Sequence, residues 1–375
     1  MKHLLVTNDF PPKIGGIQTY LYELWSRLPA GDVTVLTTRH PGSASFDRQQ
    51  SFRIVRSGSP VLLPSPGLVS QVTGLARDVG ARLVVLDPAL PVGLVGSRLS
   101  LPYAVVLHGA EITVPGRLPL ARALLASVLA PAKLLIAAGG YPAAEARRVA
   151  GGRTPPVVIV PPGVDTHRFR VLSEEQRRES RTRLGLPAEG RLVVSVSRLV
   201  PRKGMDVLIE AVAALAPAMP DLCLAIGGQG RDRPRLEALA AKSGAPVRML
   251  GRVADDDLPA LDGACDVWAM LCRDRWLGLE QEGFGIVFLE AAAAGVPQVA
   301  GRSGGAEEAV VDGETGIVVA DPGDHLAVAA ALQQLLEDEA LRKRYGNSAR
   351  KRAESDFDYD VLAERLRVAL GEAGA

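Results

Sequence analysis

The sequence predicts an α/β protein with two doubly wound domains. Short apolar runs alternate with stretches of helical period along the whole chain, which indicates parallel sheets wrapped by helices. A Pro/Gly corner at residues 161–170 interrupts this alternation and is expected to be the crossover between the domains. The length of 375 residues supports the division, because a single domain usually stops growing before this size.

The first domain is expected over residues 1–165. Its predicted strands are rich in Leu and Val with little polar alternation, which is typical of strands buried on both faces of a parallel sheet. These strands are His3–Thr7, Val33–Thr38, Phe52–Val55, Leu83–Leu86, Ala104–Leu107, Leu134–Ala137 and Val157–Val160. Helical stretches lie between most of them, such as Gln18–Arg27, Pro119–Leu129 and Ala143–Val149.

The second domain is expected over residues 166–355. Its predicted strands are Leu192–Ser197, Cys223–Ile226, Val247–Leu250, Val267–Leu271, Gln298–Ala300 and Gly316–Val319. Its predicted helices include Met205–Ala216, Pro234–Ala241, Phe284–Ala294 and Leu326–Leu336, and a last helix within 356–375 could pack back on the first domain. Two such sheets would face each other across a cleft at the carboxyl ends of their strands, where ligands bind.

Basic residues are concentrated in the first domain. Residues 1–165 hold 16 basic and 9 acidic residues, a net charge of +7, whereas the remainder hold 27 and 33, a net charge of −6. The total charge of +1 gives no global field that would draw the protein to nucleic acid or membrane. The basic first half indicates an anionic partner for that half, and chance scatter of surface charge is the alternative. The three cysteines fit thiols in a reducing cytosol. Charges and proline break the longest apolar stretch, 118–138, so any membrane contact is expected to be peripheral.

Two features of the first half suit a polar ligand. Gly15 and Gly16 precede the first predicted helix, where a ligand can approach the backbone closely and meet the helix amides. A tight turn explains these glycines equally well. His108 follows the strand Ala104–Leu107, a position suited to sugar hydroxyls or proton transfer, although a lone histidine is more often structural.

A basic loop follows the first strand of the second half. Arg198, Arg202 and Lys203 come directly after the strand Leu192–Ser197, and arginine and lysine together suit a diphosphate. A solvated basic loop is the alternative, which the position between strand and helix disfavours. Arg252 closes another strand at the same predicted edge, where it would stack on or bond a purine, or face solvent.

The most specific segment contains two acids separated by seven residues. Glu282 precedes a predicted helix and Glu290 lies inside it, so a carboxylate can accept hydroxyl hydrogen bonds while the amides of 284–287 donate to oxygens. Surface charge on a helix is the usual explanation for two acids alone. The apolar surroundings weaken that explanation, because an unpaired buried glutamate is costly.

Together these motifs make the chain resemble the retaining glycosyltransferases of family 4, which have the GT-B fold of two Rossmann-like domains. The motifs that carry the resemblance are Gly15–Gly16, His108–Gly109, Val160–Asp165, Arg198–Gly204 and the pair Glu282/Glu290. Within that family the chain is most similar to actinobacterial phosphatidylinositol mannoside mannosyltransferases of the PimB type. The segments Asn8–Gln18, Ser197–Gly204 and Glu282–Glu307 carry this closer likeness.

The resemblance implies a nucleotide-sugar donor, GDP-mannose, held mainly by the second domain. Arg198 and Lys203 would neutralise the diphosphate, Glu290 would take the ribose hydroxyls, and Glu282 would hold the mannose that His108 faces. The implied donor-binding residues are Gly16, Arg198, Lys203, Arg252, Val253, Glu282, Gly283, Phe284, Gly285, Ile286, Val287 and Glu290. The implied catalytic residues are His108, Arg198, Lys203 and Glu282, and the implied acceptor-side residues are Asn8, Asp9 and Gln18.

The resemblance also implies the acceptor, an anionic glycophospholipid of the phosphatidylinositol mannoside class bound by the first domain. It would receive its second mannose in α-1,6 linkage, and its hydroxyl would pass the proton to the departing phosphate. The segment 115–129 would lie in the membrane interface or cover the sheet as an ordinary helix. A cytoplasmic protein held peripherally on the inner face of the plasma membrane is expected, with no tightly bound cofactor and no protein metal site; Mg²⁺ is compatible with the donor.

Three other functions remain open at this point. They are a family 4 enzyme that uses a UDP-sugar on a soluble acceptor, a nicotinamide oxidoreductase, and a non-catalytic sugar-nucleotide-binding protein. Neither domain has the full glycine fingerprint of dinucleotide binding, which disfavours the oxidoreductase. The segment Cys272–Glu280 is bulkier than the Gly-rich loop of the family pattern, which bears on the acceptor more than on the donor.

Overall fold

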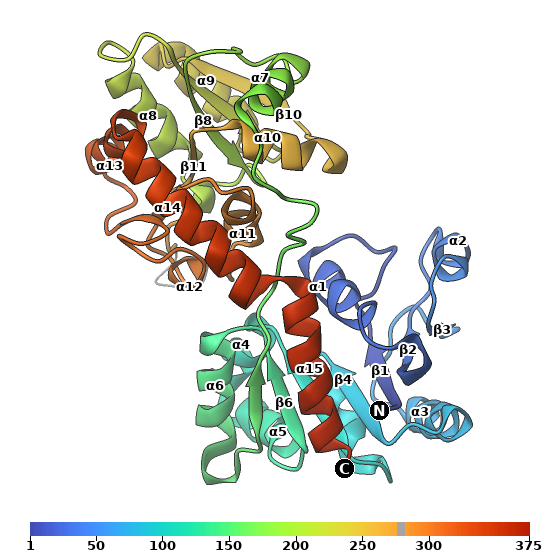
Figure 1. The fold of residues 1–375 in the computed structure, drawn as a ribbon. Helices are drawn as coiled ribbons and strands as arrows, with labels where there is room; N and C mark the ends of the chain where they lie inside the picture. Colours follow the sequence, from blue (N-terminus) through green and yellow to red (C-terminus); the bar gives the residue numbers. More distant parts are fainter. Residues whose placement is uncertain (276–281) are drawn as a thin grey trace. The chain divides into compact units, whose positions relative to one another are not determined.

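The computed structural model describes residues 1–275 and 282–375 (Figure 1). The chain forms two compact units. Unit 1 comprises Met1–Pro162 and Tyr359–Ala375, and unit 2 comprises Gly163–Asp358, so the chain passes between the units twice. The boundaries expected from the sequence, after residues 165 and 355, each lie three residues from these junctions.

Unit 1 is built on a parallel sheet. In the described part of the chain its seven strands run in the order β3-β2-β1-β4-β5-β6-β7, which reverses direction between β1 and β4. Such a reversal is the usual ligand-binding point of a doubly wound sheet. The strands are β1 His3–Thr7, β2 Val33–Thr37, β3 Arg53–Arg56, β4 Leu83–Asp87, β5 Tyr103–Leu107, β6 Leu134–Ala137 and β7 Val157–Ile159. Every strand predicted for this half is confirmed, with ends that agree to within one residue.

Both faces of the unit 1 sheet are buried. Leu4 and Val6 of β1 lie in one hydrophobic core, whereas Leu5 lies in the other, together with Leu362 and Leu366 of the C-terminal helix α15. Burial on both faces explains why the strands lack polar alternation. The helices of unit 1 are α1 Gly16–Trp25, α2 Ser43–Arg48, α3 Pro66–Val79, α4 Ala110–Arg117, α5 Pro119–Leu129, α6 Gly140–Ala150 and α15 Tyr359–Ala373, with 3-10 turns η1 Ala30–Asp32, η2 Val92–Arg98 and η3 Gly151–Arg153.

Unit 2 repeats this architecture. Over its described residues six parallel strands run in the order β10-β9-β8-β11-β12-β13, which reverses direction between β8 and β11. The strands are β8 Arg191–Val196, β9 Leu222–Gly227, β10 Val247–Gly251, β11 Val267–Met270, β12 Gln298–Gly301 and β13 Gly316–Val319. Each corresponds to a predicted strand, again within one residue at either end.

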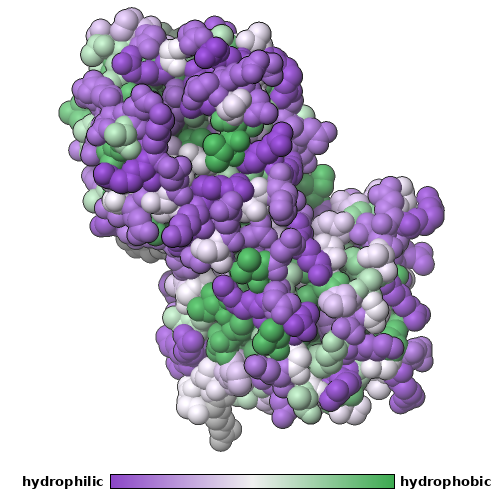
Figure 2. Space-filling model, viewed as in Figure 1, coloured by the Kyte–Doolittle hydropathy of each residue, from purple (hydrophilic) through white to green (hydrophobic). Residues whose placement is uncertain are grey.

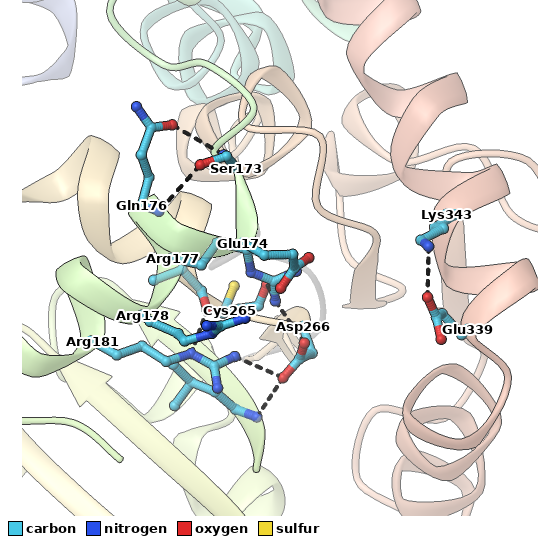
Figure 3. A network of polar contacts seen from close by, with 12 residues as sticks. Ser173, Glu174, Gln176, Arg177, Arg178, Arg181, Cys265, Asp266, Glu339 and Lys343 are labelled. Atoms are coloured by element: carbon cyan, nitrogen blue, oxygen red, sulfur yellow. Dashed lines mark hydrogen bonds and ion pairs between the residues drawn. The ribbon is translucent and has the colours of Figure 1, made fainter. Parts of the chain in front are cut away.

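Helices cover both faces of the unit 2 sheet. Leu192 and Val194 of β8 lie in one hydrophobic core and Val193 in the other. The helices are α7 Glu174–Arg183, α8 Met205–Leu215, α9 Arg233–Ser243, α10 Leu258–Ala264, α11 Ile286–Ala293, α12 Ala306–Ala309, α13 His325–Glu337 and α14 Glu339–Arg352, with 3-10 turns η4 Pro201–Lys203 and η5 Asp255–Asp257 and a π turn η6 Ala353–Phe357. Figure 3 shows how α7 is held: Arg177 and Arg181 converge on Asp266, which directly precedes β11.

Candidate active site

The loop after β8 brings two cations to the carboxyl edge of the unit 2 sheet. Its turn η4 contains Arg202 and Lys203 and ends at Gly204, whose φ is 66°. A Cβ on Gly204 would lie 2.0 Å from the carbonyl oxygen of Leu271, just after β11. Both the backbone angle and this close approach therefore require glycine, and they fix Lys203 at the point where the strand order reverses.

Glu282 binds both cations with one oxygen. Its Oε2 accepts hydrogen bonds from Lys203 Nζ at 2.6 Å, Arg202 Nη1 at 2.9 Å and the Cys272 thiol at 3.3 Å. Burial alone would raise the pKa of Glu282, but the Lys203 and Arg202 charges hold that pKa below its usual range. The carboxylate is therefore ionised, and the two cations that it binds bring the donors and positive charge that suit a diphosphate to this edge of the sheet.

The turn after Glu282 presents unused backbone donors. Among the described residues, no acceptor bonds the amides of residues 283–287, which are the orphan donors at the start of α11. Gly285 has a φ of 84°, and a Cβ there would lie 2.6 Å from the Phe288 ring. The Phe284 ring is buried against Phe357, with centroids 5.6 Å apart, so only the Phe284 amide is available to a ligand.

Glu290 lies in the second turn of α11 and is partly buried. Its carboxylate makes no hydrogen bond with the described residues. Burial raises the pKa of Glu290 to about 7, against the attraction of Arg168. Burial, and then the charge of Glu290, also raise the pKa of Asp262, which accepts a hydrogen bond from Trp268 Nε1 at 3.1 Å. Glu290 thus offers an unbonded carboxyl group to vicinal hydroxyls such as those of a ribose.

The two other arginines predicted for the donor site are exposed. Arg198 follows β8 and Arg252 follows β10, and neither guanidinium makes an ion pair or hydrogen bond with any described residue. Val253 packs against the core, where a Cβ added to Gly227 would lie 2.7 Å from its Cγ2. The structure therefore places Arg198, Lys203, Arg252, Glu282 and Glu290 around the carboxyl edge of one sheet.

Three side chains at the carboxyl ends of three strands, those of Thr7, Asp87 and His108, meet at one edge of the unit 1 sheet. Asp87 ends β4 and is fully buried; it accepts a hydrogen bond from Thr7 Oγ1 at 2.6 Å and contacts His108 Nε2 at 2.6 Å. Burial lowers the pKa of His108, but the carboxylates of Asp87, Glu111 and Asp9 outweigh burial and leave that pKa above 6.5.

The predicted acceptor-side residues lie along the same edge. Asn8 is engaged by Leu62, whose N–H donates to Asn8 Oδ1 at 2.7 Å and whose carbonyl accepts from Nδ2 at 3.2 Å. Asp9 accepts a hydrogen bond from the buried Gln18 side chain at 2.5 Å. Gly16 begins α1, and no atom lies within 4 Å of the position of an added Cβ, so its backbone is open to a ligand.

Sequence reasoning missed some residues that contact the candidate site residues. The sequence analysis does not name Asp87. Its position at the end of a strand, like that of His108 just after one, is a signal that could have identified it. The sequence gives no sign that the Cys272 thiol or the Arg202 guanidinium binds Glu282. No pattern in the sequence indicates that Asp262 comes close to Glu290.

Two expected features concern ions and membranes. Within residues 1–275 and 282–375, no group of three or more His, Cys, Asp and Glu side chains could hold a metal ion. The same residues contain no helix with the length and hydropathy needed to cross a bilayer. The segment Cys272–Glu280, which departs from the family pattern, lies partly outside the described residues, because these omit 276–281.

Comparison with known proteins places both halves of the chain in one enzyme class. Residues 14–168 match Glycosyltransferase Family 4, and residues 176–352 match Glycosyl transferases group 1. The chain is 38% identical to the GDP-mannose-dependent alpha-(1-6)-phosphatidylinositol monomannoside mannosyltransferase of Mycobacterium tuberculosis, over 97% of this chain and 96% of that protein. The chain belongs to glycosyltransferase family 4. The resemblance noted from its motifs is confirmed.

Other relatives agree with this assignment. The glycosyltransferase is 34% identical to the GDP-mannose-dependent monoacylated alpha-(1-6)-phosphatidylinositol monomannoside mannosyltransferase of Corynebacterium glutamicum, with 97% and 96% coverage. Anabaena HepE, crystallised with UDP, shares the fold with a TM-score of 0.81 at 22% identity, covering 99% and 100% of the two chains. WaaG, a glycosyltransferase of lipopolysaccharide biosynthesis, aligns with a TM-score of 0.68 at 21% identity over 98% and 100%. The predicted GT-B fold is thus confirmed.

Proposed function

We propose that this glycosyltransferase moves mannose from GDP-mannose to a phosphatidylinositol monomannoside, in α-1,6 linkage and with retention of the anomeric configuration. The activities named for the mycobacterial and corynebacterial relatives, which align over 97% of the chain, support this donor and acceptor. The observation that carries the proposal is the cluster of Lys203, Arg202 and Glu282 beside the unused amides of 283–287. A sugar diphosphate needs both positive charge and hydrogen-bond donors.

These positions are compatible with the donor roles that the family resemblance implies, which we propose as follows. Arg198 and Lys203 neutralise the diphosphate, and Glu290 accepts hydrogen bonds from the ribose hydroxyls. Glu282 and the amides after it hold the mannose, which leaves Arg252, with Val253 beside it, for the guanine. From unit 1, we assign Gly16 to the diphosphate and His108 to the sugar.

Departure of GDP is the step that these cations assist. Negative charge grows on the leaving phosphate as the bond to the anomeric carbon breaks, and the positive charges of Arg198 and Lys203 stabilise it. The acceptor hydroxyl forms its bond on the same face and passes its proton to a phosphate oxygen of the leaving group. Exclusion of water during this step limits hydrolysis of the donor.

The lipid acceptor is assigned to unit 1, at the inner face of the membrane. Among the described residues, 11 of the 13 large hydrophobic side chains exposed to solvent belong to this unit. They include Leu118, Leu120 and Leu124 around the start of α5, near Arg117 and Arg122. Figure 2 shows further hydrophobic side chains gathered on unit 1 beside α15. Apolar side chains with arginines are the composition of a surface that docks on anionic lipid.

Transfer of labelled mannose tests the proposal. Purified protein is incubated with GDP-mannose, or with UDP-glucose and UDP-N-acetylglucosamine as competing donors, and vesicles that contain phosphatidylinositol monomannoside. Label in the extracted lipid is expected with GDP-mannose only, and NMR of the product is expected to show an α linkage. Label confined to water-soluble product, or nucleotide binding without turnover, would overturn the proposal.

A further inference from the structure

Asp87 is the one fully buried carboxylate at the edge of unit 1 among the described residues, and the donor and acceptor assignments do not use it. We propose that Asp87 is a positioning residue for His108: it fixes the imidazole so that Nε2–H is committed to the protein and Nδ1 is left to donate a hydrogen bond to an oxygen of the hexose. The hexose as ligand rests on the proposed function. The orientation of His108 does not.

The direction of each hydrogen bond follows from the donors available. Thr7 Oγ1 accepts the Asp9 N–H at 2.8 Å, so its own hydrogen points to Asp87 Oδ2, 2.6 Å away. The other carboxylate oxygen, Oδ1, lies 2.6 Å from His108 Nε2. A carboxylate only accepts, so the hydrogen of this contact resides on Nε2. The ring is thereby held in a single orientation.

The surroundings leave the ring little freedom to turn. The Tyr20 ring meets His108 edge-on, with centroids 5.5 Å apart and planes at 84°, and the Tyr20 hydroxyl is itself anchored by donating to the Val160 carbonyl at 2.7 Å. The Glu111 carboxylate accepts the backbone N–H groups of His108 and Gly109. No described residue bonds Nδ1. That nitrogen is therefore the polar atom which His108 can offer to a ligand.

The charges around His108 favour a protonated ring. The groups that face it are Asp9 from the loop after β1, Tyr20 from α1, Asp87 from β4 and Glu111 from α4, and Lys13 is bound to Asp9. Burial opposes the charged form, but these carboxylates leave the pKa of His108 above its ordinary value. Nδ1–H is thus present as a donor below that pKa and is lost as the pH rises through it.

Titration of the imidazole by NMR tests the assignment without any turnover. The chain has five histidines, so histidine labelled with ¹³C and ¹⁵N gives a spectrum in which the His108→Gln variant identifies His108. The midpoint in the wild-type protein is expected above 6.5. It is expected to fall by about one pH unit in Asp87→Asn, which keeps the size and an acceptor oxygen but removes the charge. Asp47→Asn removes a carboxylate of the same unit that binds Arg56, and should leave the midpoint unchanged.

Turnover provides a second readout. The basic limb of the pH profile of kcat/KM for mannose transfer should move to lower pH in Asp87→Asn by the same amount, with a loss of about tenfold at pH above both midpoints. A wild-type midpoint at or below 6.5, or an unchanged midpoint in Asp87→Asn, overturns the proposal. If Asp87→Asn does not fold, the titration midpoint of His108 in the wild-type protein still tests the proposal. If the midpoints are as expected but no mannose is transferred, the proposed function is overturned and the role of Asp87 is not.

Discussion

Asp266 and Glu282 are two carboxylates of unit 2 that each bind two cations, and they lie at opposite edges of its sheet, Asp266 at the amino edge and Glu282 at the carboxyl edge. Asp266 accepts hydrogen bonds from Arg177 at 2.6 Å, from Arg181 at 2.9 Å and from the Leu192 N–H at 2.8 Å. By charge alone the two clusters look alike. They differ in what else their cations bind.

At the amino edge the cations have few donors to spare. Arg181 also donates to the carbonyl oxygens of Ala264 at 2.9 Å and Gly190 at 2.8 Å. At the carboxyl edge the Lys203 ammonium bonds Glu282 and no other described residue, although it has three hydrogens to donate. A charge cluster whose donors are all taken by the protein stabilises the fold, whereas one with donors left over beside unbonded amides is equipped for an anionic ligand.

The largest effect is expected at the structural cluster. Asp266→Ala leaves the guanidinium of the buried Arg181 without its counter-ion, which should lower the free energy of unfolding by about 3–5 kcal/mol. Urea denaturation measures this loss. Asp221→Ala is the matched control, because it breaks an exposed pair with Arg191 at the same edge and should cost less than about 1 kcal/mol. Equal urea midpoints for the two variants would contradict the structural role of Asp266.

Loss of a cation at the other edge should affect the chemistry. Lys203→Ala is expected to lower kcat for mannose transfer by about 10²–10³-fold, because one fixed charge on the departing phosphate is gone. Its unfolding free energy should fall less than that of Asp266→Ala, since Arg202 and Cys272 still bind Glu282. Lys203→Arg, which keeps the charge, is the control that should recover part of the rate. Full transfer by Lys203→Ala would remove the distinction between the clusters.

Substitution of Glu290 tests its proposed contact with the ribose of the donor nucleotide. Glu290→Ala should raise the KM for GDP-mannose about tenfold with little change in kcat, through loss of hydrogen bonds from the ribose to a carboxylate. The pKa of about 7 adds a pH signature: the ionised form accepts more strongly, so the wild-type KM should fall as the pH rises through 7. Glu290→Gln should lose this dependence. A KM that follows pH equally in both proteins would rule out Glu290 as the source.

The smallest effect is expected at Arg252. Its side chain is exposed, so stacking on the guanine contributes little, and Arg252→Ala should raise the KM for GDP-mannose about threefold. The ratio of kcat/KM for GDP-mannose over UDP-glucose is the sharper measurement, because it isolates the base. An unchanged ratio would show that Arg252 does not contact the guanine and only faces solvent.

Local sequence predicted the strands well because their apolar runs are buried on both faces, as the alternation of Leu4, Leu5 and Val6 between two cores shows. It also predicted which loops reach the carboxyl edges, because parallel strands end at one side. Partners across the sheet were not predictable, since they depend on side-chain directions from distant strands. Asp87 beside His108 is one example, and the Cys272 thiol on Glu282 is another.

Phe284 shows how a turn separates the role of a side chain from that of its backbone. The sequence analysis assigns its amide, within 284–287, as a donor, and the structure turns its ring into the core against Phe357 while no described residue bonds that amide. Whether a residue acts through its side chain or its backbone depends on the turn around it. Here Gly285, with a positive φ, determines that turn.

The double passage of the chain between its units bears on the order of events during synthesis. Unit 2 is continuous from residue 163 to 358, whereas unit 1 takes Tyr359, Leu362 and Leu366 of α15 into its core. The first 162 residues are therefore synthesised without the helix that completes their core, and that helix is made only after all of unit 2. Truncation of the chain after residue 358 would leave every residue of unit 2 in place but would expose the hydrophobic face of unit 1 that α15 covers.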